Sequence, residues 1–170
     1  MEFKKETQML LKDYIAFNIY FAKKKLLLNA IIFFLIFSIL ALIISYFGII
    51  KWTYSLVFGI AGVVLMTLTN ISSIKKVSSK QYESSKAMQK PSTTIINNSK
   101  VGETSEFGSI FYEWNDMYCI EKSKSTYYLF FSRIQAFIIP KRLLTQEEEN
   151  TLRQLINENL EDKKNKLKKR

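Results

Sequence analysis

The side chains that most often carry out acid–base and metal chemistry are scarce in this sequence of 170 residues. It contains no histidine and a single cysteine, Cys119. The commonest general base is therefore absent, and neither a Cys/His nucleophile nor a zinc cluster can be assembled within the chain. No glycine-rich phosphate loop of the GxxxxGK or GxGxxG type occurs. We therefore expect a non-enzymatic protein with no catalytic residue, no metal and no cofactor.

The remaining reactive groups have structural interpretations. The carboxylates of Glu147, Glu148 and Glu149 are consecutive, which suits helix capping and solvation rather than paired acid–base work. Cys119 is interpreted as a small buried residue of a strand, since one cysteine cannot form an intramolecular disulfide.

The composition favours binding chemistry, because the chain carries 25 basic and 15 acidic residues and a net charge of +10. Nucleic acid is not the expected partner, since the basic runs lack an interleaved aromatic platform. An anionic membrane leaflet attracts each nearby basic residue with about 1 kcal/mol. The candidates for contact with anionic headgroups or a partner protein are Lys23, Lys24, Lys25, Lys75, Lys76, Lys141 and Arg142.

The last two candidates follow an apolar run in the stretch QAFIIPKRLL, residues 135–144. One interpretation is a basic tip aimed at anionic lipid. The other is a corner at which Pro140 ends an edge strand and the two charges are simply solvated. The sequence leaves both interpretations open.

Two uncharged apolar segments place these lysines relative to a membrane. Leu26–Ile50 and Trp52–Ile71 contain no Asp, Glu, Lys or Arg, and each is long enough to span, because a membrane helix needs about 20 apolar residues. A buried hairpin of a soluble core is the alternative, but no other part of the chain is apolar enough to enclose it. A cleaved signal peptide is excluded by length, because its apolar core is only about 7–15 residues. We therefore predict a transmembrane hairpin over residues 26–71.

Several lysines precede the first span and several follow the second, whereas only Lys51 lies between the spans. The positive-inside rule then predicts a multi-pass membrane protein with both termini in the cytoplasm. Tyr46, Trp52 and Tyr54 are expected at the outer interface. Small residues such as Gly59 and Gly62 would let the helices approach closely.

The flanking segments are polar or amphipathic. Residues 1–25 are predicted as an amphipathic cytosolic segment, with a helix from Thr7 to Lys25 that lies in the inner interface or on the soluble domain. Residues 72–90 are a juxtamembrane connector that could continue the second helix. Residues 163–170 form a basic tail.

Residues 91–162 change to short runs with β periodicity. Strands are predicted at 92–97, 101–107, 109–114, 117–122, 126–131 and 135–140. A helix follows over 145–162, since Thr145 and Glu148 have capping-box spacing. The expected fold class is thus a membrane α-hairpin plus an α+β, mostly-β cytosolic domain. This domain would be a small antiparallel barrel or sandwich capped by the C-terminal helix, as in pleckstrin-homology-like (PH-like) domains, although periodicity alone does not select that fold.

The segment Phe111–Leu160 resembles the YcxB-like family of small bacterial membrane proteins. The resemblance is carried by the turn at Trp114, by YYLFFS (127–132) and by AFIIPKR (136–142), with LKDYIAFNIY (11–20) upstream. It implies a two-helix membrane anchor with a cytosolic PH-like domain, and it brings no catalytic or cofactor residues.

Two functions are therefore expected as alternatives. In the first, the PH-like domain binds a protein partner or anionic lipid at the inner leaflet and acts as a scaffold or interaction module, for instance through a strand edge. In the second, the chain is an immunity protein that protects its cell from a membrane-active toxin or bacteriocin. Transport by this chain alone is not expected, because ionisable residues usually mark transport paths and both spans lack them.

Overall fold

The structure is a computed structural model that describes residues 1–49, 51, 53–162 and 164–167. Trp52, predicted at the outer interface, and tail residues 163 and 168–170 lie outside the described residues. The chain divides into two compact units, one formed by Met1–Tyr14 with Gln81–Arg170 and the other by Ile15–Lys80.

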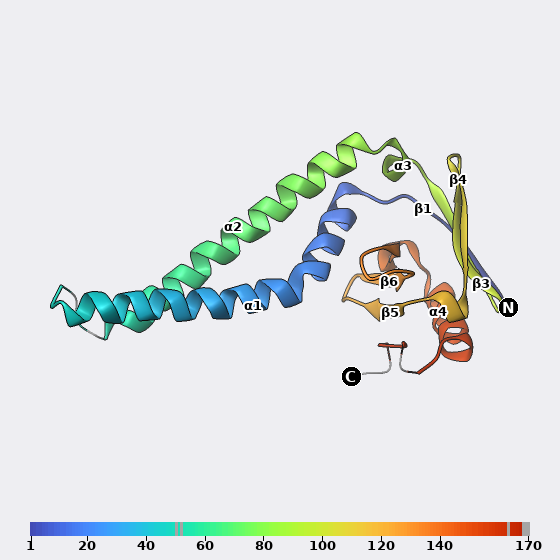
Figure 1. Ribbon diagram of the computed structural model, residues 1–170. Coiled ribbons are helices and arrows are strands. Elements are labelled where there is room, and N and C mark those ends of the chain that lie inside the picture. The colour runs from blue at the N-terminus through green and yellow to red at the C-terminus, as the bar shows by residue number, and fades with distance from the viewer. Residues whose placement is uncertain (50, 52, 163, 168–170) are drawn as a thin grey trace. The chain divides into compact units, whose positions relative to one another are not determined.

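The unit Ile15–Lys80 is built from two long helices, α1 (Leu11–Tyr46) and α2 (Tyr54–Ser84) (Figure 1). Their most apolar 18-residue windows have mean hydropathies of 3.0 and 1.8, yet only 6% and 11% of these windows are buried. A core helix of a soluble protein would bury such a surface. Both helices therefore have the length and the outward apolar surface that a membrane crossing requires.

The helix ends differ in part from the predicted spans. α1 ends at Tyr46 rather than at residue 50, and Gly48 follows with φ +74°, a conformation that suits glycine. α2 begins at Tyr54 and continues to Ser84, so the predicted helical continuation into the connector is confirmed. The short helix α3 (Lys86–Gln89) completes the connector.

The two helices approach each other at glycines. A Cβ atom at Gly59 would collide with Ser38 and Phe34, and one at Gly62 would collide with the Phe37 ring. The absence of a side chain at these positions lets α2 pack against α1, as small residues commonly do between membrane helices.

The other unit contains two separate antiparallel sheets and a C-terminal helix. The first sheet has the strand order β1-β2-β3-β4 and the second has the order β5-β6-β7. The strands are β1 (Glu2–Thr7), β2 (Ser92–Asn97), β3 (Lys100–Ser105), β4 (Gly108–Glu113), β5 (Cys119–Lys122), β6 (Thr126–Phe130) and β7 (Ala136–Pro140).

Strand β1 was not predicted, and it precedes α1 in the sequence. It pairs antiparallel with β2 along its whole length, with Phe3 opposite Ile96 and Thr7 opposite Ser92. Both membrane-type helices are therefore inserted in the sequence between two neighbouring strands of one sheet. The other six strands lie within two residues of their predicted limits.

The sequence predicted a small antiparallel barrel or a sandwich, and the described residues form two sheets that do not close into a barrel. β4 pairs only with β3, so the first sheet stops there. In the second sheet, the C-terminal segment lies beside the edge strand β5, where Asn165 forms an isolated parallel β-bridge with Ile120. The sheets thus share a core without joining into a continuous ladder.

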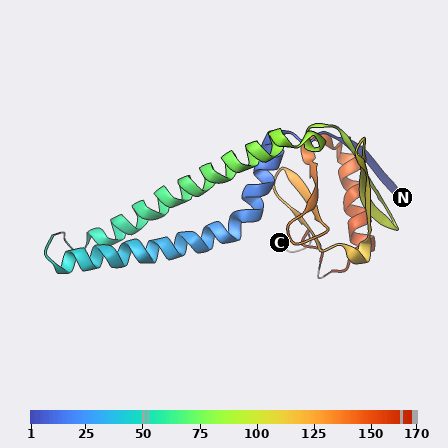
Figure 2. The same ribbon diagram turned by 45° about the horizontal axis from the view of Figure 1, so that its top comes forward.

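Helix α4 (Gln146–Asn159) supplies one wall of that core. Its predicted capping box is present: the Thr145 hydroxyl accepts from the Glu148 N–H, and the Glu148 carboxylate accepts from the Thr145 N–H. Leu152, Leu155 and Ile156 are fully buried. α4 packs against β1 and β2, and Figures 1 and 2 show it along one face of that sheet.

Candidate interaction surface at the β3–β4 hairpin

The predicted basic tip is held within its own unit. Lys141 and Arg142 lie in a 3-10 turn after β7. The Arg142 guanidinium contacts the Asp13 carboxylate at 2.5 Å, and Asp13 is only 10% exposed. The Lys141 ammonium lies 5.0 Å from the centre of the Tyr127 ring. The ion pair between Arg142 and Asp13 thus joins the β7–α4 corner to the start of α1.

The other five candidates lie on the helical unit. Lys23, Lys24 and Lys25 are exposed on α1, and Lys75 and Lys76 are exposed on α2. Counted from the contact between Ser38 and Gly59, both groups lie roughly 20–25 Å along their helices in the same direction, at 1.5 Å per residue. The structure therefore places the five lysines at one end of the hairpin. These five lysines belong to the unit Ile15–Lys80, whereas Lys141 and Arg142 belong to the other unit.

Two groups that could react are held in inert forms. Burial, together with the hydrogen bond that the Tyr127 hydroxyl donates to Glu149 at 2.5 Å, raises the pKa of Tyr127 to about 12. Burial likewise raises the pKa of the Cys119 thiol above its usual value, and Cys119 is 4% exposed, so its predicted burial is confirmed. A protonated thiol is a poor nucleophile. Within the described part of the chain, no three His, Cys, Asp or Glu side chains are grouped to hold a metal ion.

An exposed group of three apolar side chains of the sheet-containing unit lies on the β3–β4 hairpin, which the sequence reasoning did not select. Phe107 is 56% exposed, Ile110 is 55% exposed and Phe111 is 37% exposed. The Phe111 ring lies over Gly102, where a Cβ atom would collide with that ring and with the Ile110 carbonyl oxygen. An exposed apolar edge strand is a template for pairing with another chain.

The register of the hairpin defines which backbone groups are free to pair. Ser105 lies opposite Gly108 across a two-residue loop, and Ile110 lies opposite Glu103. Residues that close such a loop form a hydrogen-bonded pair, and the pattern alternates along the strands. The N–H and C=O groups of Ser109, Phe111 and Glu113 therefore point away from β3, and no backbone partner for them occurs among the described residues.

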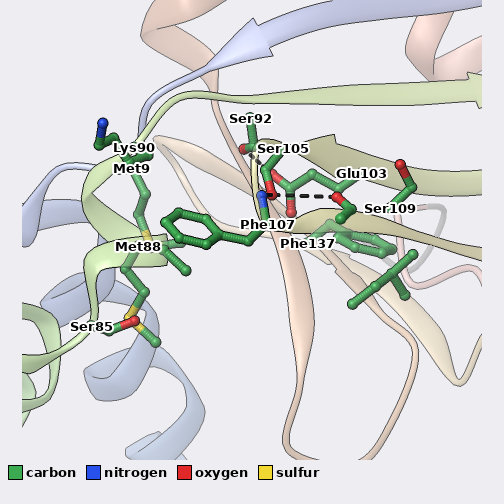
Figure 3. Close-up of a pocket in the computed structure, with 13 residues that line it drawn as sticks. Met9, Ser85, Met88, Lys90, Ser92, Glu103, Ser105, Phe107, Ser109 and Phe137 are labelled. Atoms are coloured by element: carbon green, nitrogen blue, oxygen red, sulfur yellow. Dashed lines mark hydrogen bonds between the residues drawn. The ribbon is translucent and has the colours of Figure 1, made fainter.

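A cavity of about 420 Å³ opens beside the same hairpin. Figure 3 shows Met88 and Phe107 on one side of it and Phe137 on the other. The Glu103 carboxylate also lines it and accepts a short hydrogen bond from the Ser92 hydroxyl. The cavity therefore combines apolar walls with a carboxylate.

The sequence contained only a weak signal for this surface. Strand GSIFYE has apolar residues on both faces, which is equally typical of a strand buried in a sheet centre. It is exposed because no described residue pairs with the outer edge of β4, and that arrangement is a property of the tertiary fold.

The segment that contains this hairpin matches a known protein family. Residues 96–156 match the family model described as YcxB-like protein, which confirms the resemblance over that segment. No curated protein and no solved structure matches the chain.

Proposed function

We propose that this chain, with its YcxB-like segment at residues 96–156, is a non-enzymatic interaction module held in a bacterial plasma membrane. Its two long helices would form a multi-pass anchor, and both termini would lie in the cytoplasm. Its sheet-containing unit would be a PH-like domain that docks a partner protein at β4.

The orientation in the membrane is supported by charge. Lys23, Lys24 and Lys25 on α1 and Lys75 and Lys76 on α2 lie at the same end of the hairpin. Lysines are enriched on the cytoplasmic side and meet anionic headgroups there. We assign lipid contact to these five residues.

The PH-like assignment is supported by the order of the elements. A four-stranded and a three-stranded antiparallel sheet are followed by one C-terminal helix that packs on the core. This order agrees with the PH-like plan that the family resemblance implies.

The docking role rests on the open β4 edge. Its apolar side chains are exposed, and its outward backbone groups are unpaired within the described residues. A protein strand can satisfy such groups by strand addition, whereas lipid tails offer no hydrogen-bonding group. Arg142 is already paired with Asp13, which favours a protein rather than a lipid as the ligand of this unit.

Site-specific photo-crosslinking in intact cells tests the proposal. A photoreactive amino acid is placed at Ile110 and, as a control, at Glu158, which is exposed on α4. A defined protein adduct at position 110, absent at position 158 and lost in Ser109→Pro, is the expected result. Adducts that are equal at both positions, or lipid adducts alone, would contradict it. Protection of cells against a membrane-active toxin that survives Ser109→Pro would favour the immunity function.

A further inference from the structure

We propose that β4 receives an extended segment that presents an arginine or lysine to Glu103. This inference rests on the proposed function and names the chemistry of the partner. The basic stem would cross the apolar wall of the cavity, and its charged head would reach the Glu103 carboxylate.

The geometry of strand addition selects which partner residue faces the cavity. Side chains alternate along a strand, so Ile110 and its partner Glu103 on β3 share one face of the sheet. Both also line the cavity. A partner residue opposite Ile110 would occupy a non-hydrogen-bonded pair, in which side chains lie close together. Its side chain would therefore point toward the cavity.

The Glu103 carboxylate in the cavity can accept a cationic partner. Glu103 accepts a hydrogen bond from Ser92, and a carboxylate has capacity for about four hydrogen bonds. Among the described residues no cation lies within ion-pair distance of Glu103. The lysine that lines the cavity, Lys90, pairs instead with Glu106 at 3.4 Å.

The apolar walls suit the stem of a long basic side chain. Met88, Phe107 and Phe137 line the cavity around the carboxylate. Lysine and arginine bury their methylene stems along apolar surfaces and keep the charged head at a polar group. A leucine or valine would fill the same walls but would leave Glu103 without a counter-charge.

Acidic side chains near the other end of β4 also favour a basic partner. Glu113 and Asp116 are exposed near the other end of β4, and neither forms an ion pair among the described residues. Lys100, opposite Glu113, places its ammonium over the Phe111 ring at 4.3 Å. An acidic edge on a chain of net charge +10 favours a basic partner segment.

A second copy of β4 fits these observations less well. The strand GSIFYE contains no lysine or arginine. Self-pairing along β4 would satisfy the backbone groups but would bring no cation from that strand to Glu103. We therefore assign the edge to a different, basic chain.

Peptide binding to the full chain in lipid nanodiscs tests this inference. The probes are two fluorescein-labelled peptides, Ser-Thr-Val-Arg-Val-Thr-Ser and the same peptide with leucine in place of arginine. Fluorescence anisotropy should show that the arginine peptide binds at least about tenfold more tightly, because a charge-assisted hydrogen bond is stronger than a neutral one. Glu103→Gln, which keeps a hydrogen-bond acceptor for Ser92, should remove this preference, whereas Glu158→Gln should retain it.

Other outcomes separate this inference from the proposed function. If both peptides bind equally to the wild type and Ser109→Pro abolishes both, the edge docks a strand but the basic preference is wrong. If neither peptide binds at millimolar concentration, the basic-segment inference is overturned, and the crosslinking result at Ile110 decides the proposed function. A concentration-dependent dimer, measured by light scattering and lost in Ser109→Pro, would make a second copy the occupant and overturn the inference.

Discussion

At the scale of single residues, ion pairs between distant parts of the chain hold β1 and the start of α1 against the rest of the sheet-containing unit. Asp13 and Arg142 are 129 positions apart, and Asp13 also accepts a hydrogen bond from the Leu10 N–H at 3.1 Å. Lys5 on β1 pairs with Glu148 at 2.9 Å. The capping role of Glu148 was predictable from a local motif. Neither ion pair was predictable, because both depend on how remote segments meet.

Replacing Arg142 with leucine should destabilise the sheet-containing unit, because the mostly buried Asp13 carboxylate would lose its cation. We expect a cost of about 1–2 kcal/mol, reduced from a fully buried pair because Arg142 is 35% exposed. For a domain of this size that corresponds to a melting temperature lower by about 5–10 °C.

Differential scanning fluorimetry of the full chain in detergent measures this change. Lys141→Leu is the matched control and should shift the melting temperature less. Asp13→Asn combined with Arg142→Leu should recover part of the loss. An Arg142→Leu variant that melts like the wild type would show that the ion pair contributes nothing.

Tyr127 gives a pH-dependent prediction with a definite sign. Its pKa is raised from 10 to about 12, so the fold favours the neutral phenol. This contribution to stability is complete below pH 10 and is lost as the pH rises toward 12. The melting temperature of the wild type should therefore fall more between pH 9 and pH 11.5 than that of Tyr127→Phe. An equal fall in both proteins would refute the assignment.

At the scale of elements, local patterns predicted most of the strands but not their pairing. Alternation and turn residues placed β2 to β7 within two residues. β1 was missed because its segment, EFKKET, is mostly charged and its partner β2 lies about 90 positions away. Strand pairing of that range leaves no local signature.

The close approach of β3 and β4 predicts that Gly102→Ala will be destabilising. The added methyl group would meet the Ile110 carbonyl oxygen and the Phe111 ring, and such overpacking typically costs about 1–3 kcal/mol. Chemical denaturation of the full chain, followed by fluorescence, measures the loss. Ser109→Ala changes an exposed side chain of the same hairpin and should cost much less; an equal cost would argue against steric overlap at Gly102.

The helix pair gives a corresponding prediction for the other unit. Gly62→Leu should separate α1 and α2, because the new side chain would overlap the Phe37 ring. Ala61→Leu, on the exposed surface of α2, should be tolerated. The readouts are the yield of monodisperse protein and its melting temperature in detergent. Similar behaviour of the two variants would show that the glycine contact is unimportant.

At the scale of the whole molecule, the sequence placed a hairpin before a β domain, whereas the chain inserts it between two paired strands. β1 precedes the helices and β2 follows them. The pairing of β1 with β2 can form only after both helices have been synthesised, because β1 precedes α1 and β2 follows α2. The element order left both a barrel and a sandwich open. Among the described residues the pairing stops at β4, which leaves the edge on which the proposed function depends.

Residue-resolved hydrogen exchange of β4 in the full chain, measured in nanodiscs, tests that open edge most directly. Without a partner, the amides of Ser109, Phe111 and Glu113 should exchange fast, whereas those of Ile110 and Tyr112, which point to β3, should exchange slowly. Addition of the arginine peptide should protect the first three and leave the other two unchanged. Slow exchange of all five amides without a partner, or a peptide that binds without protecting Ser109, Phe111 and Glu113, would contradict a docking edge at β4.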